Sequence, residues 1–532
     1  MSAGVVVADQ ANALGTTGNI TFDSTGTLRY TTNSAGTDWG ARFKNSGGAI
    51  QLDTGTASLV TLLGAIDTSN TGGLVKSGAG ALALGGANTY AGTTTVSQGI
   101  LAIVSAGALG RTNEGTIVTD GAQLRLTNAL GNFTVGTEAL TMSGTGGSSG
   151  GALRNSGGDN TWQGNITLAD NATIAAASGS QLTINPTSGN AITAADFSLT
   201  LDGAGTNQVL GAINLGNGGL TKTGTGIAIL TGDNSFTGGT ILGLGTLRLD
   251  HVNAAGSGTI TQSNTNSTLQ INTTGTVANA MNIYNISTLQ TVTLSGNKTL
   301  GNATFTVAAD TTTTESGVLS GPGGITKAGA GTLVVTASNS FTGNTVVNAG
   351  VLNLNSATGS ALGASTNVTV SATLLISQSG QVSDSAVVTL SGGTISRATG
   401  VSEVFGALTV SGSSVLDFGS GTAGSLAFGS YTPSSLLTLN NFFGGNVLSF
   451  NSDLTGSIAV GTYNDTSYLS GDGLFQINSI SGGFTTSYSG GTFTITAIPE
   501  PSTYLAAAGL LGLLVLSMRR RAASQSPQSP AV

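Results

Sequence analysis

The sequence predicts an all-β fold, an elongated parallel β-helix (solenoid) followed by a short C-terminal hydrophobic helix. Three observations predict it: a glycine-rich composition with few charges, a gapless internal repeat, and apolar residues that alternate with other types. Glycine supplies 84 of the 532 residues and only 7% are charged, against about 25% in an ordinary soluble domain. Hydrophobic residues make up 39%, which is enough for a core and argues against a disordered chain.

A repeated unit occurs three times, over residues 72–103, 218–249 and 323–354, and its copies align without gaps. In each copy a lysine precedes two closely spaced glycines, and an asparagine lies two residues before an aromatic residue. The residues that mark the repeat are Lys76, Lys222, Lys327, Asn88, Asn234, Asn339, Tyr90, Phe236 and Phe341.

Near the end of each copy, aliphatic residues alternate with other types, as where Leu247 and Leu249 flank Arg248. This period of two predicts short strands with one buried face, and the glycines supply the corners between them. A single coil of such strands cannot bury its apolar face, so each coil is expected to stack on the next. We assign residues 16–400 to this solenoid. Residues 401–498, which are richer in Phe and Tyr, are assigned to a C-terminal β module that covers its open end.

The marker lysines are interpreted as solvated residues on strand edges, where a charge limits sideways pairing with another chain. The alternative is a charged ladder along the solenoid that binds an anionic polysaccharide. Asparagines in equivalent corners of stacked coils are expected to form side-chain ladders.

The composition excludes several kinds of chemistry. The chain has no cysteine and a single histidine, His251, so it has no disulfide, no thiolate metal site and no two-histidine metal site. Asp250 precedes this histidine, but no nucleophile motif accompanies the pair, and we interpret it as incidental. The net charge of −8 argues against nucleic acid as a partner. We therefore expect no catalytic residue, no metal and no cofactor.

The end of the chain carries a signal in three parts. Pro499, Glu500 and Pro501 precede an apolar run over residues 505–518, which is followed by Arg519, Arg520 and Arg521. At 1.5 Å per residue the run spans about 21 Å, short of the roughly 30 Å hydrocarbon core, so we interpret it as a targeting or processing element. The residues expected to enter the membrane are Leu505, Leu510, Leu511, Leu513, Leu514, Val515 and Leu516. Residues 522–532 are expected to be a disordered tail.

This tail, from Pro499 to Arg521, resembles the PEP-CTERM sorting signal of Gram-negative bacteria that make exopolysaccharide. The lysine-marked units resemble the autotransporter-associated β-strand repeat, also called the passenger-associated transport repeat. The first resemblance implies an exosortase-type membrane enzyme as partner, with Pro499, Glu500 and Pro501 as the processing determinant. The apolar run would then be a transient membrane anchor, and the three arginines retention charges. Proteins of this class begin with a secretory signal, but residues 1–15 have no basic segment. The alternatives are a truncated export signal, a misassigned start of the chain, or a chain that is not exported in this way.

Together these observations predict a secreted structural or adhesive β-solenoid that is not an enzyme. Its tail is expected to sort it to the cell surface, outer envelope or extracellular matrix of a Gram-negative bacterium, with exopolysaccharide as a partner. The alternative is a polysaccharide-binding or polysaccharide-degrading β-helix, which predicts a groove with clustered Asp, Glu and aromatic side chains. A third hypothesis is an anchored protein whose tail is never removed.

Overall fold

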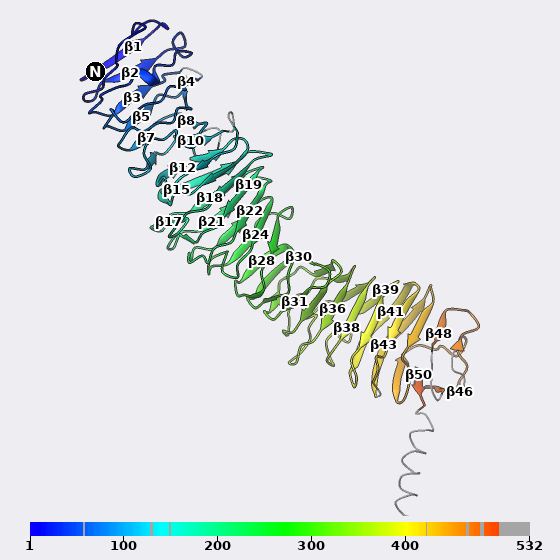
Figure 1. Cartoon of the computed structure of the whole chain (residues 1–532). Helices are drawn as coiled ribbons and strands as arrows, with labels where there is room; N and C mark the ends of the chain where they lie inside the picture. Colours follow the sequence, from blue (N-terminus) through cyan, green and yellow to red (C-terminus); the bar gives the residue numbers. More distant parts are fainter. Residues whose placement is uncertain are drawn as a thin grey trace, which may run out of the picture. The chain divides into compact units, whose positions relative to one another are not determined.

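The computed structural model describes residues 1–56, 59–127, 131–147, 150–421, 423–463, 468–478 and 483–498. These residues form two compact units, Met1–Gly317 and the part of the chain that begins at Val318. In each unit, strands from successive coils lie side by side in parallel ladders (Figure 1). Within the described ranges, helical structure is limited to the 3₁₀ turn η1 (Gly40–Arg42) and a single 3₁₀ residue, Gly147. The predicted all-β parallel solenoid is therefore confirmed.

Three long parallel ladders and one short ladder make up the first unit, and the long strands β15, β28 and β30 each belong to two of them. The first contains β1 (Val5–Ala8), β2 (Thr27–Tyr30), β3 (Ile50–Asp53), β5 (Leu74–Ser77), β7 (Thr94–Val96), β9 (Thr116–Val118), β12 (Leu140–Gly144), β15 (Ile166–Ala176), β17 (Ile192–Ala194) and β20 (Ile213–Asn214). The second contains β4 (Val60–Leu62), β6 (Ala81–Leu84), β8 (Ile100–Ile103), β10 (Gln123–Leu126), β13 (Leu153–Asn155), β15, β18 (Leu199–Gly203), β21 (Leu220–Lys222), β23 (Thr240–Leu242), β25 (Ile260–Gln262), β28 (Met281–Thr288) and β30 (Lys298–Val307). The third contains β11 (Thr134–Val135), β14 (Asp159–Trp162), β16 (Gln181–Ile184), β19 (Thr206–Val209), β22 (Ile227–Leu230), β24 (Thr246–Leu249), β26 (Thr268–Ile271), β28 and β30. The short ladder contains β27 (Gly275–Val277), β29 (Val292–Leu294) and β31 (Thr312–Glu315).

In the second unit, two parallel ladders run side by side. One contains β33 (Ile325–Ala328), β35 (Thr345–Val347), β37 (Asn367–Val370), β39 (Val387–Ser391), β41 (Ser402–Gly412), β43 (Gly424–Pro433) and β45 (Asn446–Phe450). The other contains β34 (Thr332–Val335), β36 (Val351–Leu354), β38 (Thr373–Ile376), β40 (Thr394–Arg397), β42 (Ser414–Asp417), β44 (Leu437–Asn440) and β48 (Phe475–Ile477). The short strand β32 (Leu319–Ser320) comes before both ladders in the sequence. The antiparallel strands of the unit are β46 (Gly461–Tyr463), β47 (Tyr468–Leu469), β49 (Phe484–Ser489) and β50 (Thr492–Ala497).

The register of the strands gives the length of a coil. Lys76 in β5 pairs with Leu52 in β3 and with Val96 in β7, so these successive coils are 24 and 20 residues long. The coil length therefore varies while the strands stay in register, because the corners between the strands absorb the extra residues.

The core lies inside the coils and is made by alternate residues of each strand. In β24, Leu247 and Leu249 are fully buried whereas Arg248 between them is partly exposed. Leu352 and Leu354 in β36 repeat this pattern. The burial expected from the period of two is thus confirmed in these strands.

Aromatic residues stack in the later coils of the second unit. The rings of Phe405, Phe428 and Phe450 lie in register on β41, β43 and β45. Neighbouring ring centroids are 4.9 Å and 5.7 Å apart, with nearly parallel planes. Parallel pairing continues through β45, and β50 then pairs with β45 in the antiparallel direction.

Candidate functional site

The marker lysines lie inside the solenoid. Lys76, Lys222 and Lys327 are all fully buried, each at an inward-facing position of its strand. Both interpretations made from the sequence, a solvated edge residue and a charged ladder for a polysaccharide, required an exposed ammonium, and both are wrong. The physical reason is that the corner following each lysine turns its carbonyl oxygens inward, where they accept hydrogen bonds from the ammonium.

Each lysine Nζ donates three hydrogen bonds to backbone carbonyls, one for each N–H of a protonated amine. Two acceptors are the next two residues of its own corner, and the third lies in the following coil. The acceptors are Ser77 (2.9 Å), Gly78 (2.8 Å) and Gln98 (2.9 Å) for Lys76, Thr223, Gly224 (2.8 Å) and Leu244 (3.4 Å) for Lys222, and Ala328 (2.8 Å), Gly329 (2.8 Å) and Ala349 (3.0 Å) for Lys327. We call this arrangement the lysine corner. In it, the lysine ammonium ties one coil to the next by binding backbone carbonyls of both.

The first glycine after each lysine makes this corner possible. Gly78, Gly224 and Gly329 have φ values of 76°, 68° and 73°, in the left-handed region that favours glycine. Their carbonyls are among the acceptors of the lysine ammonium. The spacing of lysine and glycine in the repeat therefore encodes one local structure.

Burial lowers the pKa of each marker lysine to about 8. The Asp53 carboxylate opposes this shift for Lys76, and Asp202 opposes it for Lys222. At pH 7 the amines therefore remain protonated, which is the form that satisfies three acceptors. A compact ammonium with three rotatable donors suits this site better than a planar guanidinium.

The marker asparagines join three successive coils. The Asn234 Oδ1 accepts from the backbone N–H of Ile213 at 2.7 Å, one coil earlier, and its Nδ2 donates to the carbonyl of Ala254 at 2.6 Å, one coil later. Asn88 and Asn339 make the same pair of bonds: Asn88 with Ile66 (2.9 Å) and Ala108 (2.6 Å), Asn339 with Leu319 (2.8 Å) and Ala361 (2.6 Å). The marker asparagines therefore bind backbone and not one another. Elsewhere, asparagine side chains of neighbouring coils do bond to each other, Asn367 to Asn344 and Asn478 to Asn440, both at 3.3 Å.

The marker aromatics fill the core beside these corners. Tyr90, Phe236 and Phe341 are fully buried. The hydroxyl of Tyr90 has a partner at the start of the next strand, the hydroxyl of Thr94 at 2.6 Å. The aromatic residue therefore packs where the asparagine fixes the backbone.

Three glutamates that were not identified from the sequence, Glu138, Glu315 and Glu403, are buried in the described part of the chain. Lys298 and Glu315 form an ion pair at 2.8 Å with both side chains fully buried, and Glu315 also accepts from the backbone N–H of Gly317 at 3.2 Å. Burial raises the pKa of Glu315 to about 7 and lowers that of Lys298, although the attraction between the two groups opposes both shifts.

The Glu138 Oε1 accepts from the Thr116 hydroxyl at 2.7 Å, and burial raises the pKa of Glu138 to about 7.

Glu138 should make the stability of the chain depend on pH. Its pKa is higher in the folded state than the ordinary value of 4.5, so the folded chain binds more protons between these pH values. Stability should therefore fall as pH rises from about 4.5 to 7, by about 1–3 kcal/mol from this group. We expect Glu138→Gln to remove this part of the slope in denaturant unfolding at several pH values. An unchanged slope in the variant would show that Glu138 is already ionised at pH 5.

The pair Asp250 and His251 does not form a catalytic arrangement. Asp250 binds Arg248 at 2.7 Å and 3.0 Å, and the Nδ1 of His251 accepts from the backbone N–H of Asn253 at 3.2 Å. Across the described ranges, no group of three His, Cys, Asp or Glu residues could hold a metal ion.

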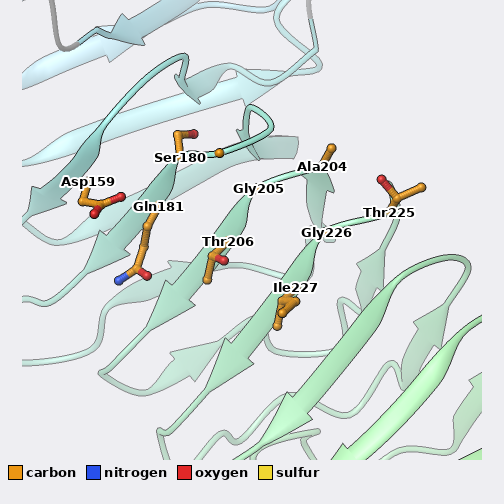
Figure 2. Close-up of a pocket in the computed structure, with 10 residues that line it drawn as sticks. Asp159, Ser180, Gln181, Ala204, Gly205, Thr206, Thr225, Gly226 and Ile227 are labelled. Carbon is orange, nitrogen blue, oxygen red and sulfur yellow. The ribbon is translucent and has the colours of Figure 1, made fainter.

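Three cavities on the surface of the described residues have room for a small ligand. Figure 2 shows one of about 440 Å³, where Asp159, Gln181, Thr206 and Ile227 begin the successive strands β14, β16, β19 and β22. A second, of about 470 Å³, is lined only by Thr, Gly and Ile residues between 237 and 261. A third, of about 350 Å³, lies over β4, β6, β8 and β10. Asp159 is the one carboxylate among the residues that line these three cavities.

The residues expected to carry sorting and processing lie outside the described residues. These are Pro499, Glu500 and Pro501, the apolar run over 505–518, and Arg519 to Arg521. In the part of the chain that is described, no helix is both long enough and apolar enough to cross a membrane.

Comparison with protein families identifies both the repeats and the tail. The passenger-associated transport repeat matches residues 74–103, 220–249 and 325–354, so each match contains one lysine corner and one marker asparagine. The PEP-CTERM protein-sorting motif matches residues 497–521. The chain therefore carries three passenger-associated transport repeats and a PEP-CTERM sorting motif. These matches indicate a secreted or cell-surface protein of a Gram-negative bacterium.

One curated relative is the adhesin BmaC autotransporter of Brucella suis biovar 1 (strain 1330). The two sequences are 32% identical over 225 residues, which is 42% of this chain and 5% of the relative. This chain thus spans a small part of the relative's length. No solved structure matches the chain.

Proposed function

We propose that this protein is an adhesive or structural solenoid of the cell surface, delivered there by its C-terminal sorting motif and associated with exopolysaccharide. The observation that carries the proposal is the repeated lysine corner. In each repeat that matches the family model, the marker lysine binds backbone carbonyls inside the coils instead of facing a ligand. The named adhesin relative supports the same conclusion. The repeats therefore serve the stability of a surface that presents many weak contacts, and we infer no enzymatic activity.

The sorting motif is proposed to act through an exosortase-type membrane enzyme. In this proposal, Pro499, Glu500 and Pro501 determine processing, the following apolar run is a transient anchor, and Arg519 to Arg521 retain the tail at the membrane. Residues 401–498 are proposed to form the module that closes the solenoid. The pairing of β50 against β45 in the antiparallel direction supports this role, because it places a new strand on the edge that β45 would otherwise expose.

Deletion of residues 499–521 should abolish delivery to the cell surface. The measurement is fractionation of a tagged chain, with intact mass of the surface form, in a host that has the sorting enzyme. The full chain should reach the surface with its tail removed, whereas the deleted chain should not. Deletion of residues 522–532 serves as the control and should leave delivery unchanged. Equal surface delivery of the 499–521 deletion would refute the sorting function, and a surface form of full mass would show a permanent anchor.

A further inference from the structure

The outer face of the first repeat carries an apolar trough. At outward-facing positions of β6 and β8, the small residues Ala83 and Ala102 are only 7% exposed. The trough has a volume of about 350 Å³, within the range of small-molecule sites. Burial at outward positions means that neighbouring side chains rise above the alanines on both sides.

Strand register shows that the trough runs along the stack of coils. Thr61 pairs with Ala83, Ala83 with Ala102, and Ala102 with Arg125, so these four residues form a floor one residue wide. The walls on either side are aliphatic: Leu59 and Ile100 on one side, Leu63 and Val104 on the other. Three steps of about 4.8 Å between paired strands make the floor about 14 Å long.

The other two repeats do not have this surface. Where the first repeat has Ala83, the second has Ile229 and the third Val334. Where it has Ala102, they have Arg248 and Asn353. The same backbone therefore accepts larger or polar side chains at these positions, and small apolar residues are not needed for the fold.

Two arginines stand at one end of the trough. Arg125 pairs in register with Arg154 of the next coil, and burial together with the Arg154 charge lowers the pKa of Arg125. The Nε of Arg125 donates to Oε1 of the buried Gln123 at 2.8 Å, and Nη1 of Arg154 donates to the carbonyl of Gly150 at 3.3 Å. Two like charges in register on adjacent coils favour an anion between them.

We propose that this trough binds a free single-chain fatty acid, with its acyl chain along the alanine floor and its carboxylate at Arg125 and Arg154. The aliphatic walls suit an acyl chain, and the narrow floor holds one such chain. A polysaccharide fits less well, because no aromatic residue lines the trough and only Thr61, Thr127 and Ser156 offer hydroxyls to it. A hydroxyl-rich ligand would lose more hydrogen bonds to water than these few side chains could replace.

Titration calorimetry of the full chain with dodecanoate, below its micelle concentration, tests the proposal. We expect saturable binding of one dodecanoate per chain. Ala83→Ile fills the floor with the residue of the second repeat and should weaken binding at least tenfold. Val334→Ile, at the same position of the third repeat, is the matched control and should bind as the parent chain does. Circular dichroism of each variant should match the parent.

The head-group contact is tested separately. The double variant Arg125→Gln/Arg154→Gln should bind dodecanoate no better than dodecanol, whereas Arg248→Gln, on the outer face of the second repeat, should keep the preference for dodecanoate. Absence of dodecanoate binding, or equal binding by Ala83→Ile and the parent, would overturn the proposal. Capture of the chain by phosphatidylglycerol vesicles without binding of free dodecanoate would also overturn it, in favour of a membrane surface.

Discussion

Replacement of Lys222 by methionine should destabilise the coils around β21 and β23 by about 2–4 kcal/mol. Methionine keeps the apolar stem of the side chain, but it leaves the carbonyls of Thr223, Gly224 and Leu244 without the donor that they share in the parent. Arginine should not rescue the variant, because its planar fork does not fit three acceptors grouped around one nitrogen. The loss is therefore specific to the geometry of an ammonium.

Native-state hydrogen exchange measures this effect, because a solenoid opens locally and each coil contacts mainly its neighbours. In the Lys222→Met variant, protection from exchange should be lost mainly in the coils around residue 222. Protection in the second unit should not change. Lys44→Met is the matched control: Lys44 forms a partly exposed ion pair with Asp67, and its loss should cost about 0–1 kcal/mol. Equal effects of the two variants would mean that the lysine corner contributes no more than a surface contact.

Replacement of Asn234 by alanine should have a comparable effect, about 2–4 kcal/mol. The variant leaves the buried N–H of Ile213 and the buried carbonyl of Ala254 unpaired. Because these two groups lie in the coils before and after Asn234, protection should be lost in three successive coils.

The same exchange experiment distinguishes this variant from a general loss of stability. Asn266→Ala, at an exposed asparagine of the same unit, is the control and should leave the exchange pattern unchanged. If Asn234→Ala lost protection only in its own coil, the asparagine would not couple the coils.

The fold was predictable because it follows from local patterns. Alternation such as that around Arg248 predicts a strand with one buried face, and glycines such as Gly224 predict corners. Neither pattern depends on knowing distant parts of the chain. The stacking of coils then follows from the need to bury each apolar face.

The lysine corners were not predictable from the same rules, because lysine is normally exposed and its acceptors here are backbone carbonyls, which no sequence pattern displays. One signal was available: three of the five lysines occupy the same position, each two residues before a glycine. In a chain with so few charges, such repetition favours a structural role.

The trough was missed for another reason, since Ala83 and Ala102 become a floor only when neighbouring coils are in register.

Lysine modification of the native chain tests the central claim most directly, that the repeats bury their charged residue to bind successive coils. Brief reductive methylation followed by peptide mass analysis should modify Lys44 and leave Lys76, Lys222, Lys298 and Lys327 unmodified until the chain is unfolded. Modification of the three marker lysines at the rate of Lys44 would contradict the account.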